Sequence, residues 1–428
     1  MNRSIKVRGL LPLAALAAAL LAGNAAAESL QQAWDTALSV DRGLKASRES
    51  SAAAASLLEA AKSARLPNVA LEAGYTALGE TPAAKVDFFG QMPLAQKGSA
   101  AYRAMATLPL YTGGRIERGI DAATAGMEAA RLGESADAQN LKLRVADAYV
   151  SVLRAGRMLK VTESHVTSLQ AHARDVGNLH EQGMVAKSDL LSVRVALADA
   201  NQRKLQVANG LDLARAAYNR LLGRPLDQPV SLDDLAPEAT QAQFPVLTER
   251  ALAQRSELAA LARQIEALRH QAAAVRGETA PQVALSGGYG YQENRYQVHP
   301  GQWMVTLGAK WNLFDGGVAG HRASAVERQV AALTEQRDEL ASIIALQVRQ
   351  TWLDVQETRK RLIVTQSAIA QAEENLLVAR DRYANGLATH TEVLDAETLR
   401  TGSESNHANA LSDAALAGLR LKRATGEL

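Results

Sequence analysis

The chain contains no cysteine. This absence excludes disulfide bonds, cysteine-ligated metal sites and thiol nucleophiles, and it leaves no residue to carry a lipid anchor at a mature N-terminus. Aromatic residues make up only 4% of the 428 residues, a small share for a compact α/β enzyme. Alanine is abundant instead, so the composition favours helix.

Catalytic signatures are absent as well. The sequence has no GxxxxGK[ST] phosphate loop and no HExxH metal motif. His390 stands near Glu392 and Asp395, but one turn of mixed polar residues at the start of a helix is more typical of a solvated surface than of a metal site. We therefore expect no enzyme, no catalytic residue, no cofactor and no bound metal.

Residues 1–27 have the layout of a secretory signal peptide. Three basic residues precede an apolar run over residues 10–22, which is too short for a permanent membrane span, and small residues favour cleavage after Ala27. Because three of the 47 basic residues lie in this leader, the remaining chain has 44 Lys and Arg against 45 Asp and Glu. The sequence thus predicts an exported protein whose balanced charge argues against a nucleic-acid partner.

The two halves of the chain resemble each other. The motif LYTGG at residues 110–114 returns as LFDGG 203 residues later, and Gly386 follows Gly183 by the same offset. A fixed offset over more than 100 residues indicates an internal duplication. We predict structural repeats over residues 28–236 and 237–428, each with a helix, a β-hairpin and a long helical hairpin whose tip lies at one of these glycines.

Proline-free tracts allow long helices. No proline occurs between Pro109 and Pro225 or after Pro300, whereas the region from Pro225 to Pro245 holds four and is expected to be a linker with little helix. Apolar and small residues recur at alternating spacings of four and three, which is typical of a coiled-coil seam. This seam includes Leu141, Val145, Ala148 and Val152 in the first half, and Ile344, Val348, Thr351 and Val355 in the second.

Four segments of about ten residues alternate between apolar and polar side chains, which is typical of strands. Each is long enough to cross a bilayer as a tilted strand. Trp303 and Trp311, at opposite ends of one apolar face, would suit the two interfacial girdles of a membrane. The segments are 68–78 and 101–110, in a hairpin of about 68–111, and 281–291 and 303–313, in a hairpin of about 281–314.

Four strands cannot close a barrel, and lipid does not tolerate an open sheet edge. If these strands span a membrane, several chains must share one barrel, and three chains would supply 12 strands. The alternative is a soluble hairpin at the end of a helical bundle. The first hairpin has 11 more residues between its strands than the second, which predicts a surface loop there.

The ordered, duplicated motifs resemble those of the TolC-type outer membrane efflux proteins over essentially the whole mature chain. The resemblance rests on the two L-[YF]-x-G-G junctions, on the pattern G-[ML]-[VA]-x-x-x-[DE]-[LV]-L starting at Gly183 and at Gly386, and on the terminal NGLATHTEVLDAE…ATGEL. The proline expected before each junction is present as Pro109 but replaced by Asn312. The resemblance implies a mixed α+β fold of mainly long α-helices. It implies a trimeric 12-strand outer-membrane β-barrel, with four strands per chain, that continues into a periplasmic α-helical coiled-coil tunnel.

The function implied by the resemblance is that of an outer-membrane exit duct in a tripartite efflux system. Such a duct is a passive conduit for cargo that an inner-membrane transporter drives through a periplasmic adaptor. The implied partners are two further copies of the chain, the adaptor (membrane fusion) protein, the transporter and outer membrane lipid. Type I protein secretion uses the same duct and stays open as the alternative. A soluble periplasmic coiled-coil adaptor is a more remote one.

Glycines at the two tips are expected to turn one helix back into the next. Ser188 and Thr391 are candidate N-caps, with Asp189 and Glu392 as acids that stabilise the first helical turn. The resemblance also makes the tips the expected docking sites for the adaptor. The tip residues are Gly183, Met184, Val185, Gly386, Leu387 and Ala388.

The resemblance gives the nearby acids a second interpretation, as a periplasmic gate. In the family, acidic residues surround the narrowest end of the tunnel, and Glu392 and Asp395 occupy those motif positions. Six such carboxylates in a trimer would favour cations. A tyrosine–acid link between neighbouring helix pairs helps to hold the closed state in the family, and Tyr383 and Asp189 stand at matching positions. The arginine of a second link is replaced by Ala388, and simple helix capping remains the alternative role for the acids.

Overall fold

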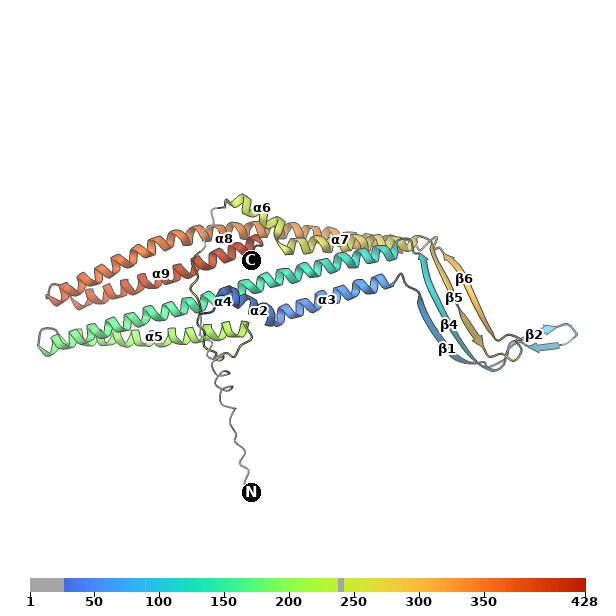
Figure 1. Cartoon of the computed structure of the whole chain (residues 1–428), viewed down its shortest axis with the longest axis horizontal. Helices are drawn as coiled ribbons and strands as arrows, with labels where there is room; N and C mark the ends of the chain where they lie inside the picture. The colour runs from blue at the N-terminus through green and yellow to red at the C-terminus, as the bar shows by residue number, and fades with distance from the viewer. Residues whose placement is uncertain (1–26, 89, 238–241) are drawn as a thin grey trace, which may run out of the picture. The chain divides into compact units, whose positions relative to one another are not determined.

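The computed structural model describes residues 27–88, 90–237 and 242–428. The leader predicted over residues 1–27 therefore lies outside the described residues, apart from Ala27. The described chain is a mixed α+β protein of mainly long helices, with a four-stranded and a two-stranded sheet (Figure 1). No helix within these described ranges is both long enough and apolar enough to span a membrane.

Two compact units make up the chain, and each combines segments from both halves of the sequence. Of the described residues, the helical unit contains 27–45, 136–237, 242–255 and 343–428. The sheet unit contains residues 46–135 and 256–342. The helices are α2 (Leu30–Val40), α3 (Arg42–Ser63), α4 (Arg115–Glu181), α5 (Lys187–Leu221), α6 (Phe244–Gln254), α7 (Ser256–Arg276), α8 (Val318–Ala384) and α9 (His390–Thr425), with a short 3-10 turn η1 (Gly277–Thr279).

In the helical unit, α4 and α5 form one antiparallel hairpin and α8 and α9 form another (Figure 1). Their packing confirms the predicted seam, because Leu141, Val145, Ile344 and Val348 are fully buried. Apolar side chains repeated at these positions pack between the side chains of the facing helix. Tyr149 and Tyr218 belong to a core cluster of this unit, with their ring centroids 6.0 Å apart in an edge-to-face arrangement.

The sheet unit contains an antiparallel sheet of order β1-β4-β5-β6. Its central pair joins the two halves of the sequence, since β4 and β5 lie side by side (Figure 1). The register between them shifts between Pro109 and Tyr111, where proline has no N–H to donate to the ladder. The strands are β1 (Asn68–Ala77), β4 (Gly98–Tyr111), β5 (Gln282–Gln292) and β6 (Gly301–Lys310).

Extra residues in the first hairpin form structure of their own. The segment expected to be a surface loop contains a small hairpin, β2 (Ala83–Val86) and β3 (Gly90–Pro93), whose residues are mostly exposed. At its turn Phe88 is fully exposed and has a φ of 75°, an uncommon value for a residue with a side chain. The insertion is therefore at the surface, as predicted, but it is not an irregular loop.

The proline-rich linker has no helix from residue 224 to residue 237. The prediction that Pro245 belongs to this linker is wrong, because Pro245 lies in the first turn of α6. Proline is tolerated there, since the N–H groups of a first helical turn have no partner within the helix.

Glu28, the residue that follows the predicted cleavage site, forms hydrogen bonds through its carboxylate, its carbonyl and its N–H. Its carboxylate accepts two hydrogen bonds from the guanidinium of Arg224, at 2.9 and 2.7 Å, and one from the Tyr218 hydroxyl at 3.0 Å. Its carbonyl accepts a hydrogen bond of 2.6 Å from Tyr149, and its N–H donates to the carbonyl of Ser231 at 2.9 Å. The segment that precedes α2 is thereby tied to the linker and to α4 and α5.

Replacing Arg224 with methionine is expected to destabilise the helical unit by about 2 kcal/mol, because a mostly buried carboxylate would lose a charged, two-pronged partner. Thermal unfolding followed by circular dichroism measures this loss. The matched control is Arg220→Met on the exposed face of α5, which should leave the melting temperature unchanged. Equal melting of both variants would contradict the assigned role of Arg224.

Candidate functional site at the helical tips

Both helical hairpins turn on a glycine with left-handed backbone geometry. Gly183 has a φ of 72° and Gly386 a φ of 70°, values that side-chain-bearing residues rarely adopt. The residue after each glycine donates its N–H back into the preceding helix, from Met184 to the Leu179 carbonyl at 2.9 Å and from Leu387 to the Arg382 carbonyl at 2.8 Å. These bonds satisfy carbonyl groups that a helix end would otherwise leave unpaired.

The predicted docking residues lie at these turns and are accessible. Met184 is 69% exposed and Leu387 is 70% exposed, although both side chains are apolar. Val185 and Ala388 are half-buried, whereas Gly183 and Gly386 are exposed. Each tip therefore presents a large apolar side chain to its surroundings.

The helix caps differ from those predicted. Thr389, not Thr391, caps α9, and its hydroxyl accepts a hydrogen bond from the Glu392 N–H at 3.4 Å while the Glu392 carboxylate accepts one from the Thr389 N–H at 3.1 Å. Ser188 does not cap α5, whose N-cap is Ala186 without a side-chain bond. Extended backbone geometry defines an N-cap, and residues 188 and 391 are already inside their helices.

The gate candidates do not form one cluster within a chain. Glu392 and Asp395 are both exposed on α9. The Glu392 Oε2 atom lies 3.7 Å from a guanidinium nitrogen of Arg382. Asp189 is half-buried on α5, with an Oδ1 atom 3.5 Å from His390 Nδ1. Within the described part of the chain, no three His, Asp or Glu side chains gather as a set of metal ligands.

Within one chain Tyr383 and Asp189 are not hydrogen-bonded, and the link between neighbouring helix pairs stays a prediction. The Tyr383 hydroxyl is buried and has no hydrogen-bond partner among the described residues. Its ring packs on His172 in an edge-to-face contact, with ring centres 5.6 Å apart. Burial raises the pKa of Tyr383, and the negative charge of Asp189 raises it further, so the hydroxyl stays protonated.

Replacing Tyr383 with phenylalanine is expected to leave the stability of the helical unit unchanged, because the hydroxyl that is lost has no bond to lose. Thermal unfolding tests this, and resting conductance in planar bilayers shows whether the hydroxyl acts in the assembled protein. A variant with raised conductance would reveal a bond to Asp189 that forms only between chains.

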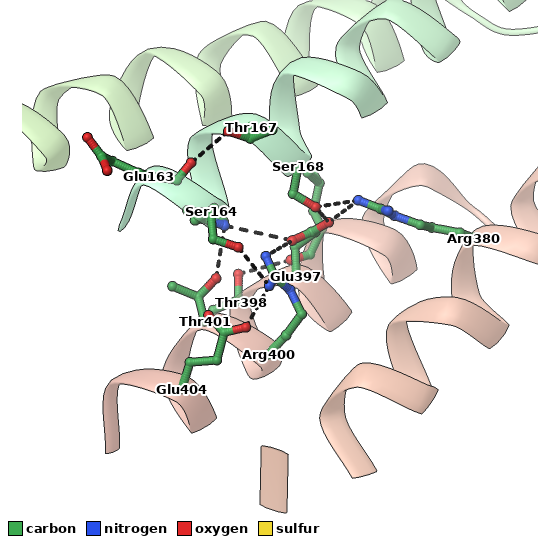
Figure 2. Close-up of polar contacts among 12 residues, drawn as sticks. Glu163, Ser164, Thr167, Ser168, Arg380, Glu397, Thr398, Arg400, Thr401 and Glu404 are labelled. Carbon is green, nitrogen blue, oxygen red and sulfur yellow. Dashed lines mark hydrogen bonds and ion pairs between the residues drawn. The ribbon is translucent and has the colours of Figure 1, made fainter. Parts of the chain in front are cut away.

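The sequence did not lead us to predict a charged cluster that lies about two turns into α9. Glu397 of α9 is completely buried and forms ion pairs with Arg380 of α8 and with Arg400, one turn along α9, at 3.4 Å (Figure 2). The Ser168 hydroxyl of α4 donates to the same carboxylate at 2.5 Å. Burial alone would raise the pKa of Glu397, but His165, Ser168 and the two arginines outweigh it and lower the pKa to about 2.

A signal for this cluster does exist in the sequence. Val393, Ala396 and Arg400 are all buried on one face of α9, and Glu397 shares that face. An acid and a base that are three residues apart, and that interrupt the apolar stripe of a helix, indicate a buried ion pair. The partners Ser168 and Arg380 have no such mark, because they lie on other helices.

The predicted girdle residues are exposed at one edge of the sheet. Trp303 is 78% exposed on β6, opposite Tyr289 of β5. Trp311, 60% exposed, lies one residue beyond the end of β6, so the strand predicted over 303–313 ends earlier than expected. Its indole N–H donates to the Thr279 carbonyl at 3.1 Å, which holds the ring near the junction with the helices.

Comparison with known proteins identifies the family. The family model for outer membrane efflux proteins matches twice, over residues 33–224 and 247–427, and so covers most of the chain. Outer membrane protein TolC of Vibrio cholerae is 23% identical over 436 residues, which include 99% of this chain and 96% of that protein.

Two further comparisons support the same assignment. Alkaline protease secretion protein AprF of Pseudomonas aeruginosa is 22% identical over 306 residues, which cover 68% of this chain and 62% of AprF. The solved structure of the outer-membrane channel OprN superposes with a TM-score of 0.81 over 93% of this chain and 90% of OprN, at 21% identity. The fold is therefore shared. This chain belongs to the outer membrane efflux protein family and, like its relatives, is a protein of the outer membrane.

Proposed function

We propose that this chain is the outer-membrane channel of a tripartite export system, a passive conduit rather than an enzyme. An inner-membrane transporter would drive cargo to it through a periplasmic adaptor. The observation that carries the proposal is the sheet. Its end strands, β1 and β6, each pair on one side only among the described residues.

Such edges require partners in lipid, because an unpaired strand edge there leaves polar backbone groups unsatisfied. The order β1-β4-β5-β6 lets β6 of one copy pair with β1 of the next. Three copies would then close a barrel of 12 strands and leave no edge. Large apolar side chains on β6, such as Trp303 and Leu307, are well exposed and would face lipid, with Trp303 and Trp311 near the two interfaces.

Membrane fractionation followed by electrophoresis tests this assembly. We expect the protein in the outer-membrane fraction as a trimer that heating in detergent dissociates, and purified trimers should conduct ions in planar bilayers without an energy source. Soluble monomers would contradict the proposal and favour an adaptor-like protein.

The proposed docking of the adaptor at the tips has its own test. A photo-crosslinking amino acid at Met184 or Leu387 should capture the adaptor encoded with the chain. The matched control is Leu205 on α5, which is apolar and 68% exposed but lies away from the turns. Capture at Leu205 with none at the tips would place the adaptor elsewhere.

Secretion of a protein is the second candidate function. It is favoured by the relative named alkaline protease secretion protein, whose alignment covers 68% of this chain. The same conduit serves both functions, so the cargo distinguishes them. Deletion of the gene should abolish export of a specific protein to the medium in one case, and raise sensitivity to small toxic compounds in the other.

A further inference from the structure

A cavity of about 730 Å³ lies between α4 and α8, close to the ends of both helices. Its lining residues come from 172–179 of α4 and from 377–384 of α8, which both belong to the helical unit. Pockets that hold small organic molecules have volumes of about 300–1,000 Å³. This cavity, the tip cavity, is therefore large enough for such a ligand.

One polar side chain in the wall of the tip cavity lacks a partner. His172 is only 4% exposed, and its Nε2 atom is buried without a hydrogen bond to any described residue. Burial lowers the pKa of His172, and the positive charge of Arg380 lowers it further, so the imidazole is neutral near pH 7. A neutral ring has one nitrogen that accepts a hydrogen bond. A ligand that brings an N–H donor into the cavity would remove the cost of leaving this buried atom unpaired.

Two acidic side chains in the lining determine which charge the tip cavity prefers. Asp175 of α4 and Asp381 of α8 are exposed, and neither forms an ion pair with a described residue. The Asp381 carboxylate accepts a hydrogen bond only from a neutral group, the side-chain amide of Asn385, at 3.4 Å. Arg380, the basic residue of the lining, already pairs with Glu397. The cavity therefore has an excess of negative charge and favours a cation.

The remainder of the lining is mainly apolar. Leu179 of α4 and Leu377 of α8 contribute aliphatic side chains, and Leu377 is 64% exposed. The ring of Tyr383, which packs on His172, adds an aromatic surface. Apolar walls favour a ligand with an apolar body, and an aromatic ring attracts an organic cation. An amine with an aromatic or aliphatic body matches both the charge and the walls of the cavity.

We propose that the tip cavity is a binding site for a hydrophobic amine, a small organic molecule with a protonated nitrogen and an apolar body. Asp175 and Asp381 attract the ammonium group, His172 accepts one of its N–H donors, and Leu377 covers the apolar body. Asp175 and His172 lie three residues apart on one face of α4, so the same nitrogen is within reach of both. Binding requires no conduction, so the inference goes beyond the proposed channel function and does not depend on it.

Fluorine NMR of the purified full-length protein in detergent tests the proposal, with para-fluorobenzylamine as the probe. Its resonance should shift and broaden in a saturable manner at pH 7, with one molecule bound per chain. The neutral analogue para-fluorobenzyl alcohol has nearly the same shape and reports partition into the detergent micelle. We expect the alcohol to bind at least about tenfold more weakly than the amine, because it lacks the charge that the two aspartates attract.

Two sets of variants locate the site. The double variant Asp175→Asn, Asp381→Asn removes both charges at nearly constant size and should raise the dissociation constant of the amine about tenfold, with that of the alcohol unchanged. His172→Phe keeps an aromatic ring against Tyr383 but removes Nε2, and should weaken amine binding about fivefold. Melting curves show that each variant is folded. If His172→Phe did not fold, the aspartate pair would still decide the question.

The matched control is Asp199→Asn with Asp212→Asn, which neutralises two exposed acids of α5 outside the cavity and should bind the amine like the wild type. Equal binding of the amine and the alcohol by the wild type would overturn the inference. So would unchanged amine binding in the aspartate pair of the cavity, or an equal loss in the control pair. A protein that binds the amine but does not conduct would refute the proposed channel function alone.

Discussion

Replacing Glu397 with alanine is expected to lower the free energy of unfolding of the helical unit by about 3–5 kcal/mol. The substitution removes one of the two carboxylates that contact the guanidinium of Arg400, whose side chain is only 11% exposed, and leaves Glu404 at 2.6 Å as the other. It also removes the acceptor that Arg380 and Ser168 share. Removing a buried acid that several donors share leaves those donors less compensated, which makes this the largest stability effect we expect.

The pH dependence of stability provides an independent measure of the same group. Because folding lowers the pKa of Glu397 from an ordinary 4.5 to about 2, the folded state favours the carboxylate by about 3 kcal/mol. This contribution is complete above pH 4.5 and is lost as the pH falls from there towards 2. Glu397→Gln, which has no carboxylate to titrate, should show a weaker loss of stability in this window.

Thermal and urea unfolding in detergent, followed by circular dichroism, measure both effects. The matched control is Glu374→Ala, which removes an exposed acid from the neighbouring stretch of α8 and should change stability by less than about 0.5 kcal/mol. If the melting temperature of Glu397→Ala equalled that of the control, the buried cluster would not stabilise the unit.

Neutralising Glu392 and Asp395 together is expected to bring the cation-over-anion permeability ratio down towards one. Two exposed acids per chain would become six negative charges around the constriction of a trimer, and such rings favour cations and bind divalent ions. The double variant should therefore also relieve block by divalent cations. Reversal potentials in salt gradients across a planar bilayer give the ratio directly.

The choice of substitution separates gating from capping. The Glu392 carboxylate takes part in the capping box of Thr389, and glutamine at that position can make the same bond to the Thr389 N–H. Glu392→Gln with Asp395→Asn thus removes charge while the start of α9 is kept. The control pair Glu335→Gln with Glu339→Gln changes exposed acids about 13 turns away along α8. Selectivity that fell equally in both pairs would count against a ring at the tip.

Much of the architecture could be predicted from local patterns. The four-three spacing through Val145 and Val348 located the buried seam, because a side chain's face on a helix depends only on its place in the repeat. Alternation located the four strands within a few residues of their observed bounds. The turns at Gly183 and Gly386 could be predicted as well, since a left-handed residue that ends a helix favours glycine.

The incorrect or missing predictions concern the first and last residues of helices and strands, and the side chains that meet between helices. Thr389 rather than Thr391 caps α9, and Trp311 lies beyond β6, because competing hydrogen bonds decide the last residue of an element. The buried Glu397 could be suspected from its place on an apolar stripe. Its partner Ser168 could not, because 229 residues separate the two and many hydroxyls on α4 are equivalent in sequence.

Periodicity, duplication and turn chemistry therefore determined the helices, strands and tips of this protein, since each depends on residues that are neighbours in the chain. Which side chains meet across α4, α8 and α9 was decided only by tertiary packing. Packing brings a carboxylate out of water, and its energy then depends on the few donors within hydrogen-bond reach.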